Sequence, residues 1–143
     1  MMTKLRLTII ISLITLASIL LVACNEKEEI SLDNLIKKMQ ESSINIEANE
    51  DDVTSTHYAY DSDSKTFYLG LQFENDELPS EEQQQKIYEK FLSKASEVTT
   101  TGDWRKALEL YNVTFEQLLS NNDKKTLALK KANSDIIELV NTK

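Results

Sequence analysis

Two groups of acidic residues have the side-chain type and spacing that could bind a metal. They occupy positions 50–52 and 74–77, on either side of a predicted pair of strands. If those strands form a hairpin, both groups flank its open end, and carboxylate oxygens are the ligands that hard divalent cations prefer. We expect these carboxylates to solvate the loops of an acidic domain and to hold no metal, with a divalent-cation site as the alternative. The candidate ligands are Glu50, Asp51, Asp52, Asp76 and Glu77.

The single histidine, His57, is the main candidate for general-base chemistry. It lies in a predicted strand with no nucleophile or second imidazole near it in sequence. Alternation places it on the face opposite Tyr58 and Tyr60, so we expect a structural or solvent-facing role. Paired carboxylates can hydrolyse glycosides, but adjacent acids mean little in so acidic a chain, and the domain is small for a substrate cleft. Serine catalysis is disfavoured because the chain has no GxSxG motif, and two glycines could hardly build a phosphate-binding loop. We expect no enzymatic activity and no cofactor, with a small carboxylate-dependent hydrolase as an alternative.

Aromatic side chains are the candidates for binding a partner, because such residues often anchor interfaces. We favour the interpretation that they line the edge of the core and keep their hydroxyls in water, with a binding face as the alternative. The candidates are Tyr58, Tyr60, Tyr68 and Trp104.

The only cysteine, Cys24, ends an apolar segment near the start of the chain. Lys4 and Arg6 precede this segment, and the 17 residues 7–23 carry no charge. A basic start, an apolar run and small residues are typical of a secretory signal peptide. As a helix the run would reach about 25 Å, less than the ~30 Å hydrocarbon core, which favours a cleaved signal over an uncleaved membrane anchor. One cysteine also excludes a disulfide within the chain.

The residues LVAC at positions 21–24 resemble the lipobox of bacterial lipoproteins. The resemblance covers residues 1–24 only. It implies cleavage between Ala23 and Cys24 and a diacylglyceryl group on the Cys24 thiol. We therefore expect a signal peptide at 1–23, a lipidated N-terminus and short tether at 24–30, and one small domain at 31–143. The expected location is the extracytoplasmic face of the cell membrane, held there by the lipid on Cys24.

The part of the chain after Cys24 is strongly acidic. Residues 25–143 contain all 24 acidic residues and 14 of the 16 basic ones, a net charge of −10. An anionic lipid surface and nucleic acid both repel such a domain, so we expect no nucleic-acid partner and no electrostatic membrane binding. The charge is uneven, with −12 over residues 25–103 and +2 over residues 104–143. We favour a solvated helix face as the explanation of the basic end, with an orientation toward the membrane or an acidic partner as the alternative.

The elements that must position these side chains indicate an α+β domain. Hydrophobic spacing predicts a helix over 31–42, and the residues after it, to Ala48, alternate as in a strand. A hairpin is predicted from 53–60 and 65–73, the second being the clearest strand in the sequence. The capping-box spacing of Ser80 and Gln83 predicts a helix over 80–98.

The last third of the sequence permits two interpretations. Apolar spacing favours a helix over 104–119, yet the residues YNVTF are strand formers that suit a second hairpin, with its return strand near 126–129. We favour the helix, and a further helix near 134–140 with Ile136, Ile137 and Val140 facing inward. The expected fold is a small antiparallel sheet built on a β-hairpin and packed by helices.

These observations favour a non-enzymatic, lipid-anchored domain that binds a protein, peptide or envelope component close to the bilayer. Five residues of tether span at most about 18 Å, which keeps the domain near the membrane. Small lipoproteins of this size and location include surface-exclusion and bacteriocin-immunity proteins, so such roles fit the resemblance. A divalent-cation-binding envelope module and the hydrolase are the competing hypotheses.

Overall fold

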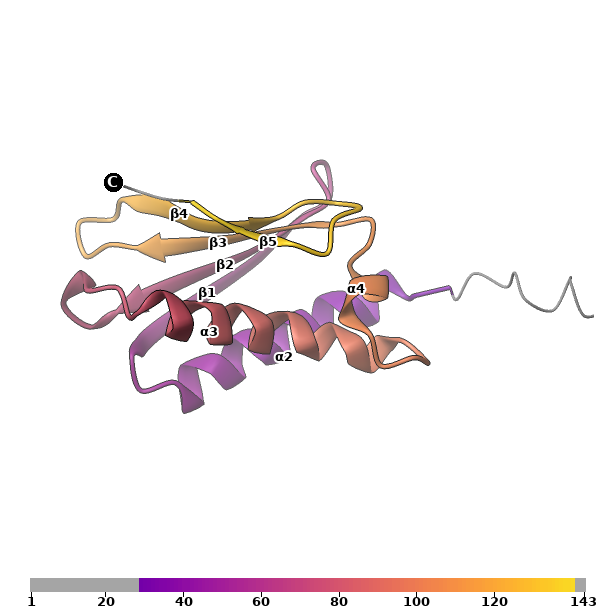
Figure 1. The fold of residues 1–143 in the computed structure, drawn as a ribbon, viewed down its shortest axis with the longest axis horizontal. Coiled ribbons are helices and arrows are strands. Elements are labelled where there is room, and N and C mark those ends of the chain that lie inside the picture. The colour runs from indigo at the N-terminus through magenta and orange to yellow at the C-terminus, as the bar shows by residue number, and fades with distance from the viewer. Residues whose placement is uncertain (1–28, 141–143) are drawn as a thin grey trace, which may run out of the picture.

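A computed structural model describes residues 29–140 of the protein. The chain forms two layers, a five-stranded sheet and a layer of helices on one of its faces (Figure 1). The predicted α+β fold, with a hairpin packed by helices, is confirmed. The elements in chain order are α2 (Leu32–Asn49), β1 (Val53–Asp61), β2 (Thr66–Phe73), η1 (Glu74–Asp76), α3 (Glu81–Ser93), η2 (Lys94–Val98), α4 (Trp104–Ala107), β3 (Asn112–Leu118), β4 (Lys124–Lys130) and β5 (Ile137–Leu139).

The strands follow one another across the sheet in the order β1-β2-β3-β4-β5. Neighbours are antiparallel except β2 and β3, which run parallel. Parallel neighbours need a long crossover connection, and the segment containing α3 supplies it. The sheet is therefore mostly antiparallel, as predicted, but mixed at its centre.

Helix α2 begins where the sequence predicts and continues seven residues beyond the expected end at 42. The Ser31 hydroxyl caps it by accepting a hydrogen bond from the Asn34 amide at 3.4 Å. The strand-like alternation after residue 43 was misleading, because Ile46 continues the buried stripe of Leu35 and Met39. Ser42 and Ser43 lie in this stripe as small polar residues, which hides its helical period in the sequence.

The first hairpin is confirmed, with β1 and β2 pairing from Val53↔Phe73 to Asp61↔Thr66. Asp61 organises the turn by accepting hydrogen bonds from the Asp63 amide at 2.9 Å and the Ser64 hydroxyl at 2.6 Å. The hydrogen bond from Ser64, followed by that from Asp63, lowers the pKa of the Asp61 carboxyl. This is the local turn chemistry that Asp and Ser favour.

The predicted helix over 80–98 is confirmed as α3 followed by η2. Its capping box is present, with the Ser80 hydroxyl accepting from the Gln83 amide and the Gln83 side chain accepting from the Ser80 amide, both at 3.3 Å. Two reciprocal bonds satisfy donors that the first helical turn leaves open.

The predicted helix over 104–119 is wrong, and the alternative of a second hairpin is correct. Only α4 is helical, and β3 and β4 pair around a turn in which Asn122 has a φ of 69°. Val113 and Phe115 are fully buried on alternate positions of β3, so tertiary burial selects the strand period over the helical one. The expected helix near 134–140 is also wrong, because β5 pairs with β4 there and Ile136 and Val140 are exposed instead of inward-facing.

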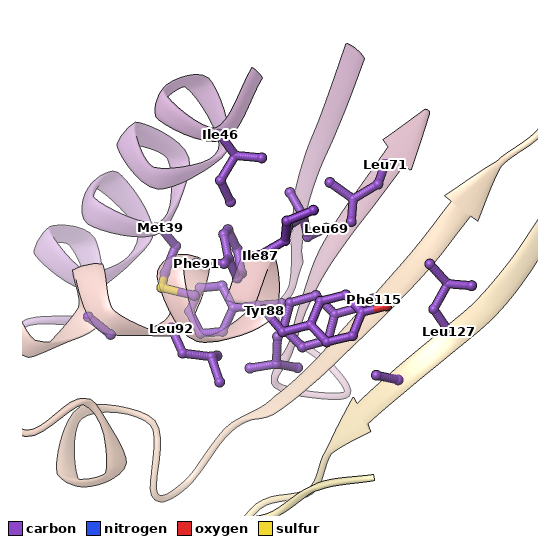
Figure 2. Packing of buried hydrophobic residues seen from close by; sticks show 14 of the residues in the cluster. Met39, Ile46, Leu69, Leu71, Ile87, Tyr88, Phe91, Leu92, Phe115 and Leu127 are labelled. Carbon is purple, nitrogen blue, oxygen red and sulfur yellow. The ribbon is translucent and has the colours of Figure 1, made fainter. Parts of the chain in front are cut away.

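The hydrophobic core lies between the helices and the sheet (Figure 2). Met39 and Ile46 come from α2 and Phe91 from α3, and they face the inward side chains of the sheet, including Leu69 and Phe115. Each of these five side chains is fully buried. The core is thus one contiguous cluster that both layers share.

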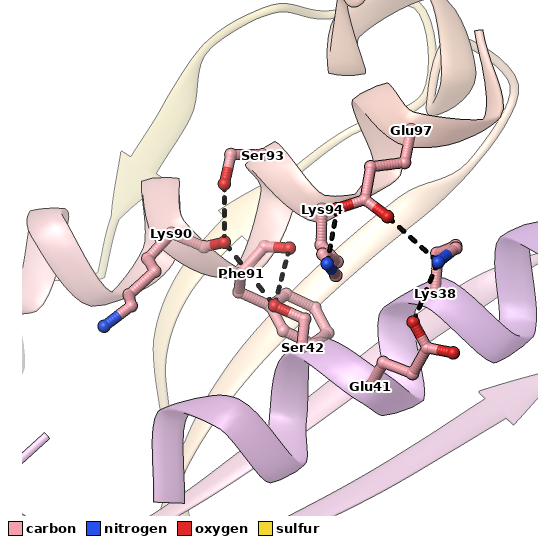
Figure 3. Close-up of polar contacts among 8 residues, drawn as sticks. All are labelled: Lys38, Glu41, Ser42, Lys90, Phe91, Ser93, Lys94 and Glu97. Carbon is pink, nitrogen blue, oxygen red and sulfur yellow. Dashed lines mark hydrogen bonds and ion pairs between the residues drawn. The ribbon is translucent and has the colours of Figure 1, made fainter. Parts of the chain in front are cut away.

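Polar contacts fix α2 against α3 and η2 (Figure 3). The buried Ser42 hydroxyl donates to the carbonyls of Phe91 at 3.2 Å and Lys90 at 3.4 Å. Lys38 pairs with Glu97 across the two helices at 2.9 Å. Hydrogen bonds to Glu97 and then Glu41 raise the pKa of Lys38. The small Ser42 allows the close approach, and this contact holds the helix layer in place under the sheet.

Candidate functional site: the helix-free face of the sheet

The helices cover one face of the sheet and leave the other free (Figure 1). Because side chains alternate along a strand, the buried Phe67, Leu69 and Leu71 of β2 face the helices, while Tyr68 and Gly70 point the other way. We call the free side the open face. The residues that the register of the four longer strands places on it include Ser55, His57, Ala59, Tyr68, Gly70, Gln72, Asn112, Thr114, Glu116, Leu118, Lys124, Thr126 and Leu129.

A glycine interrupts the open face at its centre. His57 pairs with Gly70 on one side, and Glu116 pairs with Gly70 on the other, so the three residues form one row across β1, β2 and β3. A Cβ at Gly70 would lie 3.0 Å from the Leu118 side chain, which leans across the empty position. The Leu118 side chain thus occupies the space that a side chain at position 70 would need, a close approach that the glycine permits.

A hollow of about 180 Å³ opens at this position. Its walls combine an aromatic ring, an aliphatic side chain and two charged groups. Backbone or side-chain atoms of Tyr58, Ala59 and Gly70 complete its lining. The side chains that give it its chemistry are His57, Tyr68, Glu116, Leu118 and Lys124.

The charges in the hollow are unequally exposed. The Glu116 side chain is 18% exposed, whereas its partner Lys124, at 3.5 Å, is 64% exposed. An exposed pair of this length contributes little to stability, so Lys124 can leave at small cost. Residues 29–140 carry a net charge of −10, from 22 acidic and 12 basic side chains, which draws cationic rather than anionic partners. The hollow is therefore suited to an apolar or basic side chain of a partner.

The outer edge of the sheet at β1 is protected at one point. The Glu47 carboxylate accepts hydrogen bonds from the Thr56 amide at 2.7 Å and the Thr56 hydroxyl at 3.0 Å. These bonds, the backbone one first, lower the pKa of Glu47. The backbone N–H of Thr56, which a strand added to this edge would need as a hydrogen-bond donor, is thus already bonded to α2. At this position the edge is therefore a poorer docking site than the open face.

The aromatic side chains do not gather on one surface as the sequence allowed. Tyr58 faces the helices and donates to the Ile36 carbonyl at 3.0 Å, and burial raises its pKa. Tyr60 faces the same way, with its ring centroid 4.6 Å from that of Phe67. Tyr68 alone of the four lies on the open face, while Trp104 lies in α4, against the core. As predicted, His57 lies opposite Tyr58 and Tyr60.

The two acidic groups flank the open end of the hairpin as predicted, but their carboxylates bind other partners. Glu50 pairs with Lys90, and Asp52 accepts from the side-chain Nε2 of Gln83 at 3.2 Å. Asp76 accepts from the Ser120 amide at 3.1 Å and anchors the β3–β4 turn. Asp51 and Glu77 are exposed. Among residues 29–140, no group of three His, Cys, Asp or Glu side chains is placed to hold a metal ion.

Ala23 and Cys24 lie outside the described residues, so the predicted cleavage and lipidation site stays a prediction. Within residues 29–140, the structure contains no helix that is both long and apolar enough to cross a membrane. The first described residue, Glu29, is five positions after Cys24 and leads directly into α2.

Comparison of the chain with protein-family models, with curated proteins and with solved structures finds no match. The function must therefore be argued from the residues themselves. Sequence reasoning missed Gly70, Glu116, Leu118 and Lys124, because they meet only through the pairing of β2, β3 and β4. The one available signal was Gly70, since a glycine inside a strand often marks a close approach.

Proposed function

We propose that the protein is a non-enzymatic lipoprotein, anchored by Cys24 to the extracytoplasmic face of the cell membrane, whose open face binds a polypeptide of the envelope. The lipobox resemblance supports the anchor. Two acyl chains on one glyceryl group hold a protein stably, because each buried CH₂ contributes about 0.8 kcal/mol. The anchor confines the domain to the membrane, where its partner would be found.

The observation that carries the binding role is the hollow over Gly70. It combines Leu118 and the Tyr68 ring with the shielded carboxylate of Glu116. Aromatic and aliphatic side chains beside one charge are typical of a pocket that receives a single side chain of a protein partner. The acidic domain favours a partner segment that carries basic residues, through long-range attraction.

Replacing Cys24 by alanine tests the anchor. We expect the wild-type chain to incorporate an alkyne-labelled palmitate and to sediment with membranes, and C24A to incorporate none. The label is decisive because an uncleaved apolar segment could still hold C24A in the membrane fraction. Equal labelling of both chains would show that the lipid is attached elsewhere or that the label is non-specific.

Filling the hollow with a charged side chain tests the binding role. Ala59 is exposed and lines the hollow, so Ala59→Arg places a long side chain there without disturbing the core. Gln85→Arg adds the same charge to an exposed position of α3 in the helix layer and is the matched control. We expect photo-crosslinking to an envelope polypeptide in cells to fall at least tenfold in A59R and to persist in Q85R. Equal crosslinking in both variants would exclude the open face as the binding surface.

A further inference from the structure

Two of the most exposed large apolar side chains lie in loops at the end of the domain from which the tether leaves. Leu110 is 60% exposed and Ile136 is 67% exposed. Leu110 lies between α4 and β3, and Ile136 lies between β4 and β5. Figure 1 shows the start of α2 and α4 at this same end of the molecule. We call the loops 99–111 and 131–136 the tether end.

Hydrogen bonds join the two loops into one surface. The Asn133 amide donates to the Glu109 carbonyl at 2.6 Å, and the Ala132 amide donates to the Asn112 side chain at 2.9 Å. The buried Lys130 ammonium group donates to the carbonyls of Leu108 and Tyr111. The exposed apolar side chains are therefore presented by a fixed surface and not by two independent loops.

Trp104, the only tryptophan, lies in α4, within segment 99–111 of the tether end. It is partly buried against the core, and the Arg105 guanidinium lies 4.7 Å from the centre of its ring. Tryptophan and arginine side chains are both favoured at the boundary between lipid and water. Single exposed apolar residues are ordinary on a protein surface. Leu110 and Ile136 differ from them in lying together at the tether end.

The charges at the tether end are balanced. Within loops 99–111 and 131–136, three acidic residues stand against three basic ones, and the adjoining turn, with Asp61, Asp63 and Lys65, adds a net charge of −1. The domain as a whole carries −10, so this end is repelled least by an anionic surface. Attraction must then come from apolar burial and not from charge. The charged residues of the two loops are Asp103, Glu109, Asp135, Arg105, Lys106 and Lys131.

We propose that the tether end rests on the lipid surface of the membrane, with Leu110 and Ile136 inserted among the headgroups. The inference rests on the anchoring at Cys24 in the proposed function. Five residues from Cys24 to Glu29 span at most about 18 Å, which brings this end within reach of the bilayer. The strands then run away from the membrane, and the open face stays free to meet a partner beside it.

Trp104 is an intrinsic probe for this contact. The lipidated full-length mature protein is reconstituted on phosphatidylcholine vesicles, with and without a doxyl-labelled phosphatidylcholine whose quencher lies near the headgroups. We expect Trp104 emission to shift to shorter wavelength on the vesicles and to be quenched by the doxyl lipid. Neither effect should depend on salt, because the vesicles are neutral and the contact is apolar.

The matched variants separate a specific contact from mere proximity. The double variant L110S/I136S should lose most of the quenching, and I44S should retain it. Ile44 is 63% exposed but lies on α2, away from the tether end, so it is the control for loss of exposed apolar surface. All three substituted positions are exposed, and unchanged circular dichroism melting would confirm that the variants fold.

Flotation of the vesicles distinguishes failure of the contact from failure of the anchor. A chain that floats with the vesicles but shows no quenching overturns the lipid contact and leaves the anchor standing. A chain that does not float at all overturns both. Equal quenching in the wild type and in L110S/I136S would also overturn the contact, because lipid would then reach Trp104 without these side chains.

Discussion

Phe115→Ala is expected to destabilise the domain by about 3–5 kcal/mol, the usual cost of removing a fully buried phenyl ring. Phe115 lies at the centre of the core on β3, with its ring centroid 4.2 Å from that of Tyr88 and 5.8 Å from that of Phe91. Alanine would leave a cavity between the sheet and α3 that neither layer can close. A domain of this size has a total stability of about 5–15 kcal/mol, so the loss is a large part of it.

Urea unfolding of the chain from Asn25 onward, followed by far-ultraviolet circular dichroism, measures this loss. The free energy of unfolding should fall while its dependence on urea stays the same. Ile44→Ala is the control, because Ile44 is 63% exposed and its replacement should change stability by less than about 0.5 kcal/mol. A loss below about 1 kcal/mol for F115A would contradict the burial of this ring.

The stability of the domain is expected to rise between pH 8 and pH 10 because of Lys130. This side chain is 1% exposed, and burial lowers the pKa of its amine to about 8 from an ordinary value of 10.5. In that window the unfolded chain holds the proton and the folded chain has released it. Raising the pH therefore favours the folded state, by an amount on the order of 1–2 kcal/mol.

Thermal melting at pH 7, 8, 9 and 10 checks the expectation. The melting temperature of the wild type should rise across this range, and that of Lys130→Met should not. Lys131→Met is the matched control, because the side chain of Lys131 is 61% exposed and its loss should preserve the rise. Above pH 10 the trend should weaken, because burial raises the pKa of Tyr58 and Tyr88 and their ionisation favours unfolding. If the melting temperature of K130M rose with pH as that of the wild type does, the rise would have to come from groups other than Lys130.

Lys130 also shows why the last third of the fold could not be predicted. A lysine in a run of basic residues suggests a solvated surface, yet β4 carries Lys130 into the interior, where it binds the carbonyls of Leu108 and Tyr111. The chain leaves the helical path after α4, which turns both carbonyls toward Lys130, although that of Leu108 also accepts from the Tyr111 amide at 3.1 Å. The formation of strand β4 and the burial of Lys130 therefore depend on each other, and no local sequence pattern predicts either of them.

Local chemistry determined the parts of this protein that could be predicted from sequence. The Ser31 cap, the Asp61 turn, the alternation of β2 and the capping box at Ser80 each depend on residues within a few positions of one another. Such interactions do not depend on the tertiary structure, so they can be predicted from short stretches of sequence. The lipobox resemblance at LVAC has the same local character, and lipidation of Cys24 stays a prediction.

Tertiary structure alone decided three other features. Burial of Val113 and Phe115 selected strand over helix where both periods fitted the residues. The parallel pairing of β2 with β3 placed Glu116 beside Gly70 and so made the hollow. Hydrogen bonds between separate loops brought Leu110 and Ile136 to the tether end. Each depends on residues far apart in the chain, whose approach is set by the closing of one shared core and is therefore not visible in any local stretch of sequence.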